Sequence, residues 1–159
     1  MMWFNFIKRY GFRNITQGGQ ITGFQFKIHL PYYSGLWVSQ AFQDLAVRVD
    51  GVNYPTDKIS VKVGDRVFRW AQIDQAYDVM WYYGEPATII IDKPGGLTTG
   101  LHKVECDIHY MRSYSLKPQD AAKTKPFVPP AAAPGEDGYS SFAATKEWHK
   151  DSDDLVLVI

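Results

Sequence analysis

The chain has 159 residues, of which 45% are hydrophobic and 15% aromatic, which suits one domain with a substantial core rather than two. Its 17 basic and 17 acidic residues give no net formal charge, so the composition disfavours nucleic acid or an anionic membrane as a partner. The single cysteine, Cys106, excludes an internal disulfide framework and a cysteine-built zinc site, and is compatible with a reducing compartment.

The N-terminal stretch MMWFNFIKRYGF superficially resembles a targeting segment. Its basic residues Lys8 and Arg9 follow the apolar residues instead of preceding them, and no small-residue cleavage site comes after. We therefore expect a first β-strand over Trp3–Phe12. No later segment is long and apolar enough to span a membrane, which predicts a soluble, cytoplasmic protein.

Alternating and turn residues predict most of the strands. Asn14–Gln20 contains Gly18-Gly19 and predicts a turn. From Gly23 the sequence alternates, which predicts a half-buried antiparallel strand that ends at Pro31. Its expected inward residues are Phe24, Phe26, Ile28 and Leu30, and its expected outward residues are Gln25, Lys27 and His29. An aromatic loop with Tyr32, Tyr33 and Trp37 follows.

Two hairpins are predicted next. Leu45–Val49 and Val52–Tyr54 flank an Asp50-Gly51 pair, and Ile59–Val63 leads through Gly64-Asp65 into Arg66–Trp70. Trp70–Tyr77 lacks strand character and is predicted to hold one helical turn.

The stretch from Tyr77 to Leu97 organises the chain. It begins with an aromatic cluster that includes Trp81, Tyr82 and Tyr83, and continues through a β-branched run over residues 87–91. Three consecutive isoleucines predict a strand in the middle of a sheet with apolar cover on both faces. The cluster has more ring surface than a small core requires, which indicates a partner or ligand face.

The C-terminal third divides into three segments. His102–Tyr114 alternates, with Val104, Cys106, Ile108 and Tyr110 expected inward and Glu105, Asp107 and His109 outward. Residues 117–150 are rich in Pro, Ala and Gly and predict a long extended arm. Leu155–Ile159 is wholly apolar, so we expect it to return to the sheet as a last strand whose end is buried or covered by another subunit. Cys106 is then a buried, inert thiol.

Eight to ten short strands with hardly any helix predict an all-β fold. The most consistent architecture is a two-layer antiparallel β-sandwich of jelly-roll or Greek-key type, as a single domain over residues 1–159.

No catalytic or metal-binding arrangement is apparent in the residues. The four histidines show no paired spacing with a carboxylate, and His29 and His109 are expected on the solvent or interface side. Asp78 and Glu85 could form an acid–base pair, but their spacing says little about distance. Gly95-Gly96 is interpreted as a turn and not a phosphate loop, because no Lys-Ser/Thr and no helix follow.

The aromatic groups are the better candidates. They fit stacking on a sugar or a polyphenol, and equally the anchors of a protein interface or plain core packing. The candidate pocket or interface residues are Tyr32, Tyr33, Trp37, Trp81, Tyr82 and Tyr83; no catalytic residue and no metal ligand is predicted in this chain.

The segments GFQFKIHLPYYSG, DLAVRVDG and AYDVMWYYGEPATIIIDKPGGLTTGLHKVECDIHYMRSY, in this order, together resemble the β subunit of bacterial C-glycoside deglycosidases. The resemblance covers residues 23–114 and the apolar last strand, whereas the arm over residues 117–150 is longer than the family pattern. It implies a small β-sandwich subunit without catalytic residues of its own. Its partner would be a TIM-barrel α subunit that holds a divalent metal, Mn or Mg, and the catalytic base.

The substrate class that the resemblance implies is a flavonoid or anthraquinone C-glycoside, such as carminic acid, already oxidised at sugar carbon 3. The enzyme would be a carbon–carbon lyase that releases the aglycone and a 1,5-anhydro-hex-1-en-3-ulose. A different class of function, a stand-alone carbohydrate-binding module with stacking aromatics, remains the alternative. A structural scaffold without a ligand is a third.

Overall fold

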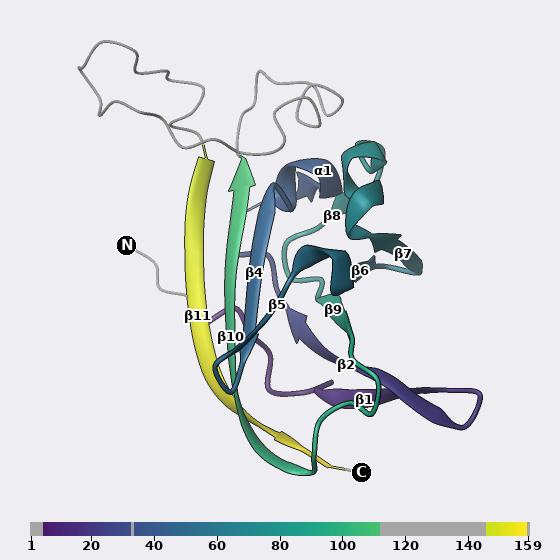
Figure 1. The fold of residues 1–159 in the computed structure, drawn as a ribbon. Helices are drawn as coiled ribbons and strands as arrows, with labels where there is room; N and C mark the ends of the chain where they lie inside the picture. Colours follow the sequence, from purple (N-terminus) through teal and green to yellow (C-terminus); the bar gives the residue numbers. More distant parts are fainter. Residues whose placement is uncertain (1–4, 33, 112–145, 159) are drawn as a thin grey trace.

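The computed structural model describes residues 5–32, 34–111 and 146–158, which form a sandwich of two antiparallel sheets (Figure 1). The larger sheet contains, in spatial order, β1 (Arg13–Gln17), β2 (Gln20–Ile28), β9 (Ala87–Asp92), β6 (Ile59–Val63) and β7 (Arg66–Arg69). The smaller sheet contains β11 (Lys146–Leu157), β10 (Gly100–Met111), β4 (Asp44–Val49) and β5 (Val52–Tyr54). A two-stranded ladder of β3 (Leu36–Trp37) and β8 (Met80–Trp81) lies beside the one-turn helix α1 (Val38–Ala41).

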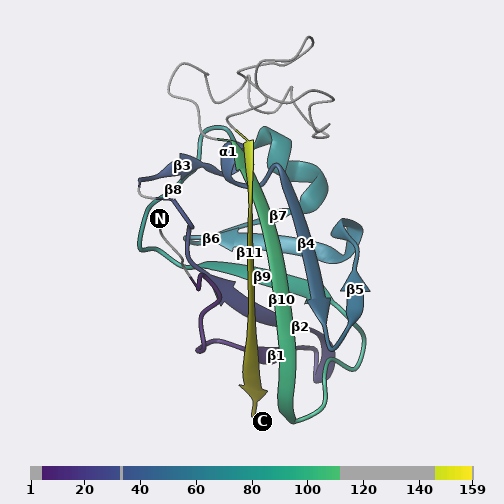
Figure 2. The ribbon, with the colours of Figure 1, turned by 90° about the vertical axis from the view of Figure 1, so that its left-hand side faces the viewer.

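The strands of the two sheets cross at a steep angle, with β10 and β11 upright and β6 and β9 running across them (Figure 2). Neighbours in each sheet are often distant in sequence: β9 lies between β2 and β6, and β10 between β11 and β4. The chain thus passes repeatedly between layers, as in Greek-key folds. The predicted all-β sandwich is confirmed.

Glycines with positive φ build the three tight hairpins. Asp50 and Gly51 have φ of 51° and 82°, and Gly18 and Gly19 have 57° and 80°, values that suit two-residue turns matched to strand twist. The β6–β7 turn places Gly64 at a φ of 63°. The predicted hairpins are therefore confirmed, but the predicted turn over Asn14–Gln20 is too long, because the chain before Gly18 already belongs to β1.

The core fills the space between the sheets. The side chains predicted to face inward over residues 24–30 and in β10 are almost wholly buried, as expected. Gln25, predicted to face outward, is only 8% exposed, because the chain at Gly11 covers it and accepts a hydrogen bond from its amide. Because β9 pairs with β2 and β6, it occupies the middle of its sheet as predicted. The prediction of apolar cover on both faces of β9 is wrong in part. Ile89 and Ile91 are fully buried, whereas Ile90 on the outer face is partly exposed and lies beside the polar Ser60.

Two predicted boundaries are wrong. Described residues before Arg13 form only an isolated bridge between Ile7 and Ile28, although Phe6 and Ile7 are buried. A positive φ of 80° at Gly11 separates this segment from β1. The last strand begins at Lys146 and not near Leu155, so residues 146–150 belong to β11 and not to the predicted arm. The rest of that arm to residue 145 lies outside the described residues.

The predicted outward residues of β10 share its outer face but not an exposed environment. Asp107 is only 8% exposed, because the Arg48 guanidinium lies 3.7 Å from its carboxylate and 2.8 Å from that of Glu105. His109 is fully buried, so its predicted solvent exposure is wrong; α1 packs on β10 near this end, where residues 108–111 are buried on both faces. No helix within the described ranges is long and apolar enough to cross a membrane.

Candidate subunit interface and binding pocket

The aromatic residues before β9 divide into a buried and an exposed group. Trp81 in β8 is fully buried and stacks on Phe42, with ring centroids 5.1 Å apart and planes 5° from parallel. Its indole Nε1 donates a hydrogen bond to the Glu85 carbonyl at 2.6 Å. A buried indole whose donor is satisfied in this way serves packing, and it fixes the turn that leads into β9.

Tyr32 is likewise part of the packed interior. It is 5% exposed and its ring lies 5.4 Å from that of Tyr110, which in turn stacks on His149 of β11 at 4.8 Å. This column of rings links the loop after β2 to the two long strands of the smaller sheet. Tyr33, predicted alongside it, lies outside the described residues.

The exposed group lies in the turn between β8 and β9. Tyr82 is 63% exposed and Tyr83 is 58% exposed, and a positive φ of 86° at Gly84 completes the turn. Trp37 in β3 is half-buried and pairs with Met80 of β8. Of the five predicted residues that the structure describes, Tyr82 and Tyr83 are the most exposed, and Trp37 is less so. Their contact with a partner or ligand stays a prediction.

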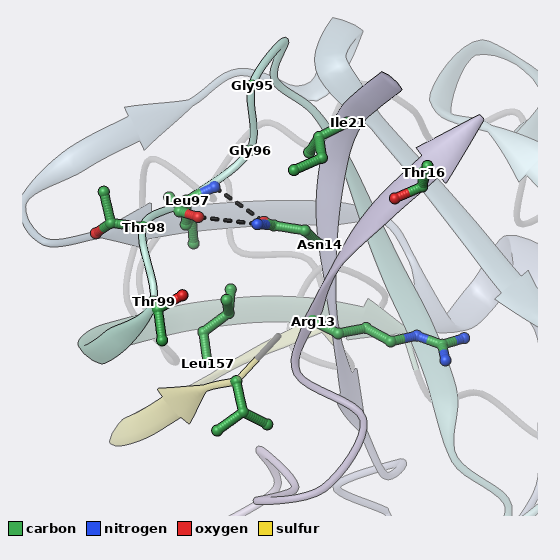
Figure 3. Close-up of a pocket in the computed structure, with 11 residues that line it drawn as sticks. Arg13, Asn14, Thr16, Ile21, Gly95, Gly96, Leu97, Thr98, Thr99 and Leu157 are labelled. Atoms are coloured by element: carbon green, nitrogen blue, oxygen red, sulfur yellow. Dashed lines mark hydrogen bonds between the residues drawn. The ribbon is translucent and has the colours of Figure 1, made fainter. Parts of the chain in front are cut away.

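A pocket of about 520 Å³ lies at the opposite end of the sandwich (Figure 3). Its walls come from three elements: the β1–β2 hairpin, the loop between β9 and β10, and the end of β11. Apolar surface is supplied by Ile21, Leu97 and Val158, and hydroxyls by Thr16, Thr98 and Thr99, whereas Leu157 behind them is only 1% exposed. None of the described residues that line it is aromatic.

Asn14 holds one wall of this pocket in place. Its amide donates to the Leu97 carbonyl at 2.8 Å and accepts from the Leu97 backbone N–H at 2.9 Å, as the dashed lines in Figure 3 show. The adjacent Gly96 has a φ of 61°, and a Cβ there would come within 2.7 Å of Ile21 Cγ2. Glycine is thus required where the loop passes over β1 and β2.

His102 at the start of β10 anchors the same loop from the other side. One ring nitrogen lies 2.7 Å from the Thr98 carbonyl and the other 2.6 Å from the Asp50 carboxylate, which also accepts from the Lys103 N–H at 2.9 Å. Burial lowers the pKa of His102, but the hydrogen bonds to Asp50 and Thr98 and the Asp50 charge raise it above its ordinary value. The His102 hydrogen bond, the Lys103 hydrogen bond and the His102 charge hold the pKa of Asp50 below its ordinary value, against burial.

Both partners of His102 are acceptors, so the ring satisfies them together only when both nitrogens carry protons. The arrangement therefore favours an imidazolium paired with a carboxylate, consistent with the direction of both pKa shifts. It ties the loop after β9 to the turn between β4 and β5.

The remaining chemical candidates are structural. Cys106 is fully buried, as predicted, and burial raises the pKa of its thiol, which disfavours the nucleophilic thiolate. Gly95 and Gly96 form the predicted turn, with φ of 84° and 61°. Among the residues that the structure describes, no three His, Cys, Asp or Glu side chains group as metal ligands.

The comparisons with known proteins are decisive about the family. Residues 4–114 match the family described as C-glycoside deglycosidase beta subunit. The chain belongs to this family. A C-glycoside deglycosidase beta subunit from Eubacterium cellulosolvens is 35% identical over 109 residues, covering 68% of this chain and 74% of the relative. One from Arthrobacter globiformis is 25% identical over 69 residues, covering 43% of this chain and 52% of the relative.

The matched region contains both ends of the sandwich described above, except for the contribution of β11. These matches confirm the family that the sequence resemblance predicted. A beta subunit implies an alpha-subunit partner. The pocket was missed from the sequence, because Asn14 and Leu97 are 83 residues apart and nothing in either local pattern joins them.

Proposed function

We propose that this chain is the non-catalytic but required small subunit of a heteromeric, cytoplasmic carbon–carbon lyase that cleaves 3-oxo-C-glycosides of flavonoid or anthraquinone type. The observation that carries the proposal is the family match over residues 4–114. The exposed Tyr82 and Tyr83 side chains support it, because large exposed rings are typical anchors of protein interfaces.

The chemistry of the substrate explains why a lyase is needed. A C-glycosidic bond has no leaving-group oxygen to protonate, so hydrolysis by two carboxylates does not apply. A ketone at sugar carbon 3 makes the proton on carbon 2 acidic. When a base removes that proton, the aglycone leaves from carbon 1 by β-elimination as a carbanion stabilised by its phenols, and this carbon then takes up a proton from the conjugate acid of the base or from water. The products are the free aglycone and the 1,5-anhydro-hex-1-en-3-ulose.

In this proposal the TIM-barrel α subunit holds the base and a divalent metal, Mn or Mg, which would polarise the ketone. This chain supplies a rigid face for that subunit to pack on. The Trp81 ring, stacked on Phe42 and bonded to the Glu85 carbonyl, holds the turn that presents Tyr82 and Tyr83. A preformed turn reduces the entropy lost when the two subunits associate.

The test is aglycone release from a 3-oxo-C-glycoside by the α subunit alone, by the α subunit with this chain, and by the α subunit with a Tyr82→Ala/Tyr83→Ala variant. We expect release to require this chain and the variant to weaken co-elution of the two subunits. A matched control, Val67→Ala, removes an exposed apolar side chain from β7, at the far edge of the larger sheet. Full activity of the α subunit alone would refute the proposal.

Calorimetric titration of the full chain with glycans separates the lyase subunit from the carbohydrate-binding module. Binding of glycans by the chain alone, with no effect on an α subunit, would favour the module instead.

A further inference from the structure

The pocket between the β1–β2 hairpin, the loop after β9 and the end of β11 has groups free to meet a ligand. Within the described ranges, the hydroxyls of Thr16, Thr98 and Thr99 make no hydrogen bond to the protein. Ile21 and Val158 are 40% and 68% exposed, so apolar surface also remains in contact with water. A volume of about 520 Å³ falls within the range of small-molecule sites.

Contacts within the protein hold the loop wall of the pocket in place without a ligand. The Asn14 side chain bonds to the N–H and the carbonyl of Leu97, and the His102 ring bonds to the carbonyl of Thr98. Three backbone groups of the loop are therefore fixed. Gly96 of that loop lies so close to Ile21 that a Cβ on Gly96 would be 2.7 Å from Ile21 Cγ2. Surface loops are ordinarily the more mobile parts of a fold, and a wall fixed in advance lowers the entropic cost of binding.

The lining restricts the chemical class of the ligand. Among the lining residues that the structure describes, Arg13 alone is charged, and its guanidinium extends away from Leu157 and Thr99 (Figure 3). An ionic ligand would therefore have no charged partner beside the apolar wall. Free sugars are also poorly matched, because the described part of the lining offers no aromatic ring for stacking. Aliphatic walls edged by hydroxyls and backbone groups suit an apolar ring that carries neutral hydroxyls.

We propose that this pocket binds an uncharged phenolic ring, with the ring against Ile21 and Leu97 and its hydroxyls bonded to Thr98 and Thr99. The inference goes beyond the function proposed above, because it assigns this chain a ligand site of its own, away from the exposed tyrosines. It does not depend on the α subunit or on turnover.

The experiment is a titration of the full chain, labelled for NMR, with resorcinol and then with the bicyclic 7-hydroxychromone. We expect amide shifts confined to residues 13–21, 95–99 and 156–158, with 7-hydroxychromone binding more tightly. Glucose, with hydroxyls but no apolar face, and toluene, with an apolar face but no hydroxyl, should each bind at least about tenfold more weakly than resorcinol. An absence of shifts with both phenols, shifts centred elsewhere, or comparable binding of glucose would each overturn the proposal.

Variants locate the site. Thr98→Val/Thr99→Val keeps the shape of both side chains. It should weaken the binding of 7-hydroxychromone by at least about fivefold, the equivalent of one net hydrogen bond. Ile21→Asp, at an exposed rim position, should weaken the same binding by at least about tenfold. Val67→Asp is the matched control, since Val67 is 54% exposed and lies at the other edge of the same sheet. Unchanged binding in the threonine variant, with its spectrum otherwise intact, would contradict the assignment.

Discussion

The two ends of this sandwich are stabilised by different kinds of interaction. At the end with α1, β3 and β8, the indole of Trp81 is buried and stacked on Phe42. At the end with the pocket, a few polar contacts made by Asn14 and His102 position an exposed loop. Apolar burial is insensitive to pH and distributed over many contacts, whereas a polar anchor depends on one or two groups. Stability should therefore be concentrated at the first end, and sensitivity to conditions at the second.

Removing Trp81 tests the first end and should give the largest effect. Trp81→Ala deletes a fully buried ring, leaves a cavity beside Phe42, and removes the hydrogen bond to the Glu85 carbonyl. We expect a loss of about 3–5 kcal/mol in the free energy of unfolding, measured by urea denaturation. Trp81→Phe should recover part of this loss, because a ring still fills most of the site. A loss below about 1 kcal/mol would mean that this end is not the main source of stability.

Asn14→Ala tests the second end. It removes both hydrogen bonds to Leu97 and should cost about 1–3 kcal/mol, less than the indole. Asn14→Asp is the matched variant, because it retains an acceptor for the Leu97 N–H and loses the donor. Hydrogen exchange should show faster exchange over residues 95–99 in Asn14→Ala and little change at α1. A uniform increase across both ends would contradict the proposed independence of the two regions.

The architecture could be predicted because its determinants are local. Alternation of apolar residues over 24–30 and 102–111 fixed the two inner faces, and paired turn residues fixed the hairpins. The errors have physical causes. Phe6 and Ile7 bury their side chains without forming a ladder, so the apolar pattern before Phe12 overstated the strand character of this segment. His109 was misplaced because period-2 alternation gives the face of a strand but not what covers that face.

The sites were harder to predict because they depend on contacts between distant residues. The sequence indicated excess ring surface, but only the structure divides it into the packed Tyr32 and Trp81 and the exposed Tyr82 and Tyr83. The pocket depends on Asn14 meeting a loop 83 positions later. A β-hairpin asparagine and a Gly-Gly turn each have ordinary local explanations, so neither signals the other.

The pH dependence of stability sharpens the comparison further. The raised pKa of His102 means that its stabilising contribution is complete below about pH 6.5, its ordinary value, and is lost as the pH rises through the folded-state pKa. The lowered pKa of Asp50 adds a contribution present above its ordinary value of 3.8 and lost as the pH falls through its folded-state pKa. The pair should thus stabilise the pocket end most in the interval between these two ordinary values.

The measurement is the free energy of unfolding from about pH 5 to about pH 9, for the wild-type chain and for Asp50→Asn. Asp50→Asn keeps a hydrogen-bonding side chain and removes the charge, so the decline above neutral pH should shrink and stability at the acidic end should fall by about 1–2 kcal/mol. His29, whose pKa is lowered by burial and then by Lys8, contributes equally to both proteins and cancels in the difference. An identical pH slope in the two proteins would exclude the His102–Asp50 pair as its source.

The smallest expected effect on stability is at Tyr82 and Tyr83, although they belong to the aromatic end. Both rings are more than half exposed, so Tyr82→Ala and Tyr83→Ala should each change the free energy of unfolding by less than about 0.5 kcal/mol. If the rings anchor the α subunit, the same substitutions should weaken association by more than about 1 kcal/mol each. Urea denaturation and subunit titration of the same variants separate the two roles. A loss of stability comparable to that of Trp81→Ala would instead place these rings in the packing of the turn.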